Sequence, residues 1–149
     1  MSGRKASQTN WSVAIVVAIV LVASAFLIVR PVPEEVVGIS DDGLTRASGL
    51  TRSSETLVIE RIDNAETSIL EVVSPVYQVS LTGGDSLNDG EFVMTLDESE
   101  SVSKSVLYTF DRTTFEWIPL PTLFSLSEGT ISASLNFSGS LLIVAGARE

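Results

Sequence analysis

The segment with the clearest potential for chemistry is the acidic run from Asp85 to Glu91, which reads DSLNDGE. Calcium takes about six to eight hard oxygen ligands, and an acidic loop between strands can supply several of them. The candidate ligands are Asp85, Asn88, Asp89 and Glu91. Their spacing does not match the D-x-[DN]-x-[DN]-G-x5-E calcium loop, so a solvated turn is the favoured interpretation and no metal or cofactor is expected.

Catalytic groups are scarce in this chain. It has no cysteine and no histidine, which excludes disulfides, Cys/His zinc sites, iron-sulfur clusters, the Ser-His-Asp triad and every cysteine nucleophile. Asp97, Glu98 and Glu100 could suggest the carboxylate pair of a glycoside hydrolase, but nothing in the sequence holds them at a defined separation. The sequence therefore predicts a protein that is not an enzyme and has no evident small-molecule substrate.

Four aromatic residues cluster in one predicted hairpin. Tyr108, Phe110, Phe115 and Trp117 flank the turn at 111–114. Cross-strand aromatic pairs stabilise a hairpin, so core packing is the favoured role. The alternative is that Trp117 projects outward as an anchor for a partner, since tryptophan is enriched in interface hot spots.

The segment from Trp11 to Val29 carries no charge over nineteen residues. A helix of this length would span roughly 28 Å, close to the hydrocarbon core of a bilayer, and the segment is therefore predicted to be a single transmembrane helix. A cleavable signal peptide is the competing interpretation, with an A-x-A site at residues 23–25. The residues expected to contact membrane lipid are Trp11, Val13, Ile15, Ile19, Leu21, Phe26, Leu27 and Ile28.

Charge is distributed unevenly on the two sides of this segment. Residues 1–10 are short, polar and basic and are predicted to form a cytoplasmic stub, because positive residues favour the cytoplasmic side. Residues 31–149 hold six bases against nineteen acids, a net charge of −13. This predicts a plasma-membrane protein with a periplasmic or extracellular C-terminal domain. The acidic domain makes nucleic acid a poor partner, and the lack of disulfides favours a prokaryotic envelope.

Residues 30–55 are rich in Ser, Thr, Gly and charge and contain a tandem hexad, GLTRAS followed by GLTRSS. Two copies are too few for a solenoid, so a flexible linker is the favoured interpretation. A docking peptide is the alternative. Its contact residues would be Leu44, Arg46, Leu50 and Arg52, which recur at one spacing.

From residue 56 to 149 the hydrophobic pattern changes to a period of two, which is typical of strands. No helical period occurs in this part. The pattern predicts an antiparallel β-sandwich with immunoglobulin-like character. The expected strands are 57–62, 67–73, 77–81, 92–96, 105–110, 115–118, 131–137 and the continuously apolar 141–145.

Three stretches carry a resemblance to a known family: VYQVSLTGGDSLNDGEFVMTLDES, VLYTFDRTTFEWIPLPT and ISASLNFSGSLLIVAG. Together they resemble the ZU5-like β-sandwich modules of exported bacterial and archaeal proteins, over about Leu57 to Gly146. The resemblance rests on strand order and aromatic placement, and it implies a structural or interaction domain without active residues. The sequence departs from the family pattern at 141–143, where Leu-Leu-Ile replaces the usual aromatic residue.

These features predict a non-enzymatic, single-pass membrane protein. Its expected role is that of an accessory or structural subunit of a larger membrane or envelope complex, which it would contact through its helix and its β-sandwich. Membrane lipid and the other subunits of the complex are the expected partners. The alternative is a tethered surface adhesin or carbohydrate-binding module, which would show exposed aromatic residues on one face of the sandwich.

Overall fold

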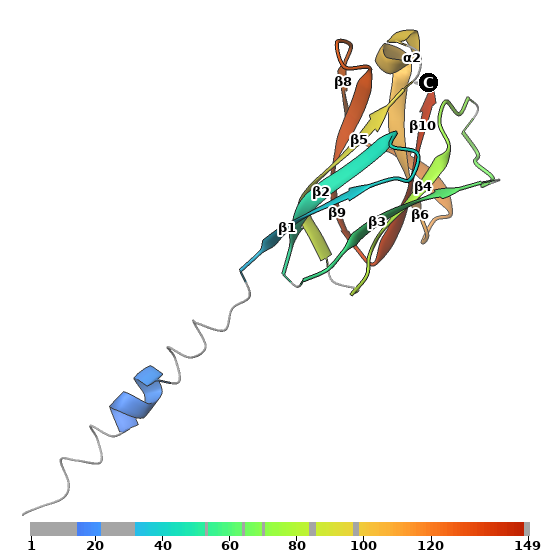
Figure 1. The fold of residues 1–149 in the computed structure, drawn as a ribbon. Coiled ribbons are helices and arrows are strands. Elements are labelled where there is room, and N and C mark those ends of the chain that lie inside the picture. Colours follow the sequence, from blue (N-terminus) through green and yellow to red (C-terminus); the bar gives the residue numbers. More distant parts are fainter. Residues whose placement is uncertain are drawn as a thin grey trace, which may run out of the picture. The chain divides into compact units, whose positions relative to one another are not determined.

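In the computed structural model, the chain is described over residues 15–21, 32–52, 54–63, 65–69, 71–83, 86–96 and 99–147. It divides into two compact units, Met1–Val32 and Pro33–Glu149. The second unit contains the β-domain, whose strands are drawn in Figure 1.

The described part of the first unit is a short helix over residues 15–21, in which Ile15, Ile19 and Leu21 are exposed. Within the described residues, no helix combines the length and the apolar character needed to cross a bilayer. The prediction of a transmembrane helix over Trp11–Val29 is therefore corrected. At 1.5 Å per residue the described helical residues 15–21 cover about 10 Å, whereas a span needs about 20 residues. The other residues assigned to membrane contact, which lie outside the described part of the chain, are Trp11, Val13, Phe26, Leu27 and Ile28.

The β-domain contains two five-stranded sheets. Sheet 1 has the order β1 (Glu34–Ile39), β2 (Thr45–Thr51), β5 (Ser86–Thr95), β9 (Thr130–Ser138) and β8 (Thr122–Ser125). Sheet 2 has the order β3 (Leu57–Ile62), β4 (Val76–Leu81), β10 (Ser140–Ala147), β6 (Ser105–Asp111) and β7 (Glu116–Pro119). Every pairing between these strands is antiparallel. The predicted antiparallel all-β fold is confirmed.

The core lies between the sheets and explains the period of two in the sequence. On β4, Tyr77, Val79 and Leu81 are buried, whereas the alternating Gln78 and Ser80 are only half-buried. The same alternation on β5 and β9 buries side chains that meet those of sheet 2 in one apolar cluster. The largest fully buried core side chains are Tyr77, Phe92, Leu87, Met94, Leu107, Ile131 and Ile143.

Most of the predicted strands form where the pattern placed them. The predicted hairpin is the antiparallel pair β6–β7, in which Phe110 lies opposite Trp117. The apolar segment 141–145 lies within β10, the central strand of sheet 2.

Four local predictions are wrong. The segment 85–91 was expected to be a solvated turn, but residues 86–91 belong to the strand β5. The strand expected over 67–73 is reduced to a single bridge between Val72 and Gly146, and 65–69 has no regular structure. The edge strand β8 was not expected, because the proline residues before it indicated that the preceding strand ends and gave no sign of a new one. The helix α2 (Ser99–Lys104) was also missed, since its six residues are too few to show a period.

The segment 30–55, predicted to be a flexible linker, contains β1 and β2 instead. The β-domain therefore begins near Pro33 rather than at residue 56. The hexad was misleading because its two copies have different roles. Gly43 lies in the β1–β2 turn with a φ of 70°, a value that favours glycine, whereas Gly49 is buried within β2. The inward positions of β2 hold small residues such as Ala47, so a hydrophobic pattern is hard to see.

The assignment of the core predicts that alanine substitutions at two leucines have very different effects on the free energy of unfolding. Leu107 is fully buried and Leu126 is 58% exposed. We expect Leu107→Ala to lower the free energy of unfolding by about 2–5 kcal/mol, because it removes buried apolar contacts and leaves a cavity. Leu126→Ala should change it by less than about 0.5 kcal/mol. Urea unfolding of the two full-length variants measures both values, and equal losses would contradict the assigned core.

Candidate interaction surface

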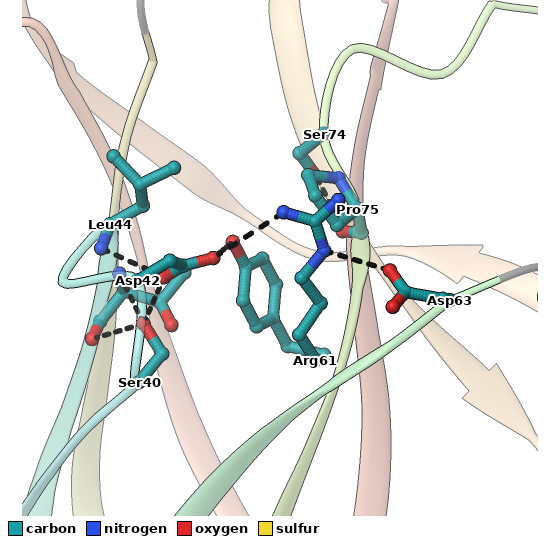
Figure 2. A network of polar contacts seen from close by, with 9 residues as sticks. Ser40, Asp42, Leu44, Arg61, Asp63, Ser74 and Pro75 are labelled. Carbon is teal, nitrogen blue, oxygen red and sulfur yellow. Dashed lines mark hydrogen bonds and ion pairs between the residues drawn. The ribbon is translucent and has the colours of Figure 1, made fainter.

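A polar network joins the β1–β2 turn of sheet 1 to sheet 2 (Figure 2). Tyr77 Oη donates a hydrogen bond of 2.7 Å to Asp42 Oδ2, and Ser40 Oγ donates one of 2.6 Å to Asp42 Oδ1. The Leu44 N–H donates to the same Oδ1 at 3.0 Å. Arg61 lies 4.0 Å from Asp42 Oδ2 through Nη1. Asp42 therefore receives polar contacts from both sheets.

The charge of Asp42 follows from these contacts. Partial burial raises the pKa of its carboxyl, but hydrogen bonds from Ser40, Tyr77 and Leu44 and the charge of Arg61 outweigh that effect. The pKa of Asp42 is lowered from its ordinary value of 3.8. A carboxylate that is kept ionised in this way stabilises the fold and is poorly suited to exchange a proton at neutral pH.

A second feature is a groove on the outer face of sheet 2, which we call the aromatic groove. It has a volume of about 610 Å³. Trp117 lines it, and the ring centroid of Trp117 lies 5.3 Å from that of Phe110. The lining residues are Ser68, Ile69, Val106, Tyr108, Glu116, Trp117, Pro119 and Leu120.

A third feature is a run of exposed apolar side chains along residues 115–126, which we call the apolar edge. It consists of Phe115 (77% exposed), Ile118 (42%), Leu123 (73%), Phe124 (51%) and Leu126 (58%). The edge strand of sheet 2, β7, leads through two residues into the edge strand of sheet 1, β8. Residues 117–127 carry no charge, although residues 31–149 have a net charge of −13.

The described candidate calcium ligands are Asn88, Asp89 and Glu91, all on β5. Asn88 and Asp89 lie where β5 shifts its register against β9, and the Asp89 N–H donates to Asn136 Oδ1 at 2.8 Å. Glu91 lies opposite Ser134 on β9, and Asp85 is outside the described residues. Across the described segments, no three acidic side chains are grouped so that they could hold a metal ion.

The residues proposed for a docking peptide lie on or beside β2. Arg46 and Arg52 are exposed, whereas Leu44 and Leu50 are half-buried. Since β2 is paired with β1 on one side and β5 on the other, its backbone is already used by the sheet. Only its outward side chains remain available to a partner. Of the residues proposed for interaction, Trp117 lines the aromatic groove.

Sequence reasoning missed the loop wall of the aromatic groove and the extent of the apolar edge. The wall comes from Ser68 and Ile69, which were assigned to a strand. The edge did have a signal in the sequence, because residues 117–127 carry no charge and include Leu123, Phe124 and Leu126.

Comparison of the chain with models of known protein families, with curated proteins and with solved structures finds no match. The resemblance to ZU5-like modules therefore stays a prediction that rests on strand order and aromatic placement.

The polar network predicts that the free energy of unfolding depends on pH through the ionisation of Asp42. Because the pKa of Asp42 is lower in the folded than in the unfolded chain, its contribution to stability is complete above the unfolded value of 3.8 and is lost as the pH falls through the folded value. We expect Asp42→Asn to cost about 1 kcal/mol at neutral pH, with a difference from wild type that shrinks below pH 3.8.

Urea unfolding between neutral and acidic pH measures this difference. Asp41→Asn is the matched control, since Asp41 is an exposed acid in the same turn. If the difference in the free energy of unfolding between Asp42→Asn and wild type stays constant down to the lowest pH, the ionised carboxylate does not stabilise the turn.

Proposed function

We propose that this protein is a non-enzymatic interaction module that serves as an accessory subunit of a larger protein assembly. The observation that carries the proposal is the apolar edge. Isolated exposed apolar residues are normal on a protein surface, but five of them lie here within the twelve residues 115–126, and such a concentration is typical of an interface.

The position of the apolar edge suits protein binding. An edge strand presents unpaired backbone donors and acceptors, and proteins usually protect such edges with charge. On β8, Leu123 is 73% exposed and Phe124 is 51% exposed, and no charged residue lies within the strand. A partner that covered these side chains would remove apolar area from water and could extend sheet 1 by a strand.

The surrounding charge limits where a partner can sit. The acidic residues elsewhere in 31–149 repel other acidic surfaces and would be costly to bury without a counter-charge. The uncharged stretch 117–127 avoids this cost. The predicted transmembrane helix is contradicted within the described residues, so the proposed contact is made by the β-domain alone.

Affinity purification of the tagged full-length chain from its native cells, followed by mass spectrometry, tests the proposal. The test variant is Leu123→Gln/Phe124→Gln, and the control is Ile39→Gln, since Ile39 is 63% exposed on β1, the other edge strand of sheet 1. We expect stoichiometric partners with wild type and with the control. The test variant should lose them, because a central apolar contact contributes enough to change affinity by about tenfold or more.

Two results would contradict the proposal. One is a wild-type chain that purifies alone. The other is a folded Leu123→Gln/Phe124→Gln variant that keeps every partner in the same ratio as wild type.

A further inference from the structure

The groove side of the β6–β7 hairpin is one uncharged face. Tyr108 lies opposite Pro119, and Phe110 lies opposite Trp117. Residues that are directly paired in an antiparallel sheet, or are two apart on one strand, point to the same side of the sheet. Tyr108, Trp117 and Pro119 therefore share the face that lines the aromatic groove. The side chain of Glu116 belongs to the opposite face of β7, so it does not place a charge in the groove.

The wall and floor of the aromatic groove are fixed by contacts within the domain. Ser68 and Ile69 supply a wall from outside the strands. Ile69 packs closely on β10, because a Cβ added at Gly146 would lie only 2.6 Å from Ile69 Cγ2. Tyr108 Oη donates a hydrogen bond of 3.1 Å to the Ala147 oxygen, which fixes the phenol ring. A groove fixed in this way binds a ligand without the cost of ordering its own side chains.

Trp117 is supported by a row of aromatic rings. Its ring centroid lies 5.3 Å from that of Phe110, and the Phe110 centroid lies 6.4 Å from that of Phe115. Neither phenylalanine is among the residues that line the groove, so both support the indole from beside it. Phe115 has a φ of 58°, which is costly for a bulky residue, and its N–H donates to the Asp111 oxygen at 2.8 Å. The hairpin thus holds the indole at the groove.

The polar groups of the groove limit the chemistry of its ligand. Trp117 Nε1–H and the Ser68 hydroxyl make no hydrogen bond within the described part of the chain. The indole N–H is only a donor, and the Tyr108 hydroxyl already donates to the Ala147 oxygen. No carboxylate or side-chain amide points into the groove from β6 or β7. A fitting ligand therefore brings hydrogen-bond acceptors and apolar surface, with few donors and no charge.

A proline-rich segment has this combination of properties. Each proline carries a carbonyl acceptor and an apolar ring and has no backbone N–H. Such segments adopt the extended polyproline II helix in water, and this helix docks in aromatic-lined grooves at a low cost in entropy. A sugar is less suitable, because its many hydroxyl donors would lack carboxylate or amide acceptors. A charged segment would find no counter-charge in the groove.

We propose that the aromatic groove binds a proline-rich segment of a partner protein in the polyproline II conformation. The proline rings pack against Trp117 and Ile69, and the segment's carbonyl oxygens accept hydrogen bonds from Trp117 Nε1–H and the Ser68 hydroxyl. The groove and the apolar edge share no residue, so this inference does not depend on the proposed function.

Calorimetric titration of the full-length chain tests the inference. The probe is a peptide of eight L-prolines, blocked at both ends. The matched probe is the same peptide made from D-proline, which has the same composition and solubility but forms a helix of the opposite hand. We expect saturable binding of the L-proline peptide and binding weaker by at least about tenfold for the D-proline peptide, because the fixed groove fits one hand only.

Two protein variants locate the site. Ser68→Ala should weaken binding of the L-proline peptide by about two- to tenfold, because one hydrogen bond to the ligand is lost. It should leave the free energy of unfolding unchanged, since the Ser68 hydroxyl has no partner within the described residues. In the Trp11→Phe chain, Trp117 is the sole tryptophan, and its emission should change with the same midpoint as the calorimetric titration.

Two further variants serve as controls. Ser134→Ala removes an exposed hydroxyl on β9, outside the groove, and should leave the affinity unchanged. Leu123→Gln/Phe124→Gln should also leave it unchanged, which separates this inference from the one about the apolar edge. A chain that binds the L-proline peptide but purifies alone from its native cells would support this inference and contradict the proposed function.

Three results would overturn the inference. The first is the absence of saturation with the L-proline peptide, and the second is equal affinity for the D-proline peptide. The third is saturation of the Trp117 emission by a neutral oligosaccharide but not by the L-proline peptide, which would make the groove a carbohydrate site.

Discussion

The β-domain depends on one shared layer of side chains between its two sheets. Each strand of β4, β5 and β9 has polar or half-buried residues at alternate positions, so neither sheet can stay in water with its inner face uncovered. Tyr77 links this layer to the polar network, because its ring is fully buried while its hydroxyl donates to Asp42. The turn at 40–44, the register of β1 against β2 and the packing of the sheets are thus coupled through one residue.

The sequence was most informative where burial requires large apolar residues at every second position. The hairpin β6–β7 and the segment 141–145 could be predicted because their apolar and aromatic residues leave little choice of structure. The strand β2 could not be recognised, because its buried positions include Thr45, Ala47 and Gly49. The N-terminal apolar run led to the opposite error, since its hydropathy predicted a spanning helix and no helix within the described residues is long and apolar enough to cross a bilayer.

The candidate surfaces were harder to predict than the fold, for a physical reason. The aromatic groove combines residues 68 and 69 with strands β6 and β7, and only tertiary packing brings these together. Trp117 could be identified as a contact residue from its type alone, but its neighbours in the groove could not. The two surfaces also differ in shape, since the groove is a hollow of about 610 Å³ and the apolar edge is a run of exposed apolar side chains that includes the edge strand β8.

The place of β10 in sheet 2 has a consequence for the synthesis of the protein. This strand is made last of the ten, yet it lies in the centre of its sheet, between β4 and β6. Until residues 140–147 have left the ribosome, β4 and β6 have no common partner and the inner face of sheet 2 cannot close over sheet 1. Pairing of strands so distant in sequence is slow, and the incomplete chain exposes apolar surface in the meantime. The growing chain is therefore exposed to aggregation and to chaperone binding until β10 has been made and has paired with β4 and β6.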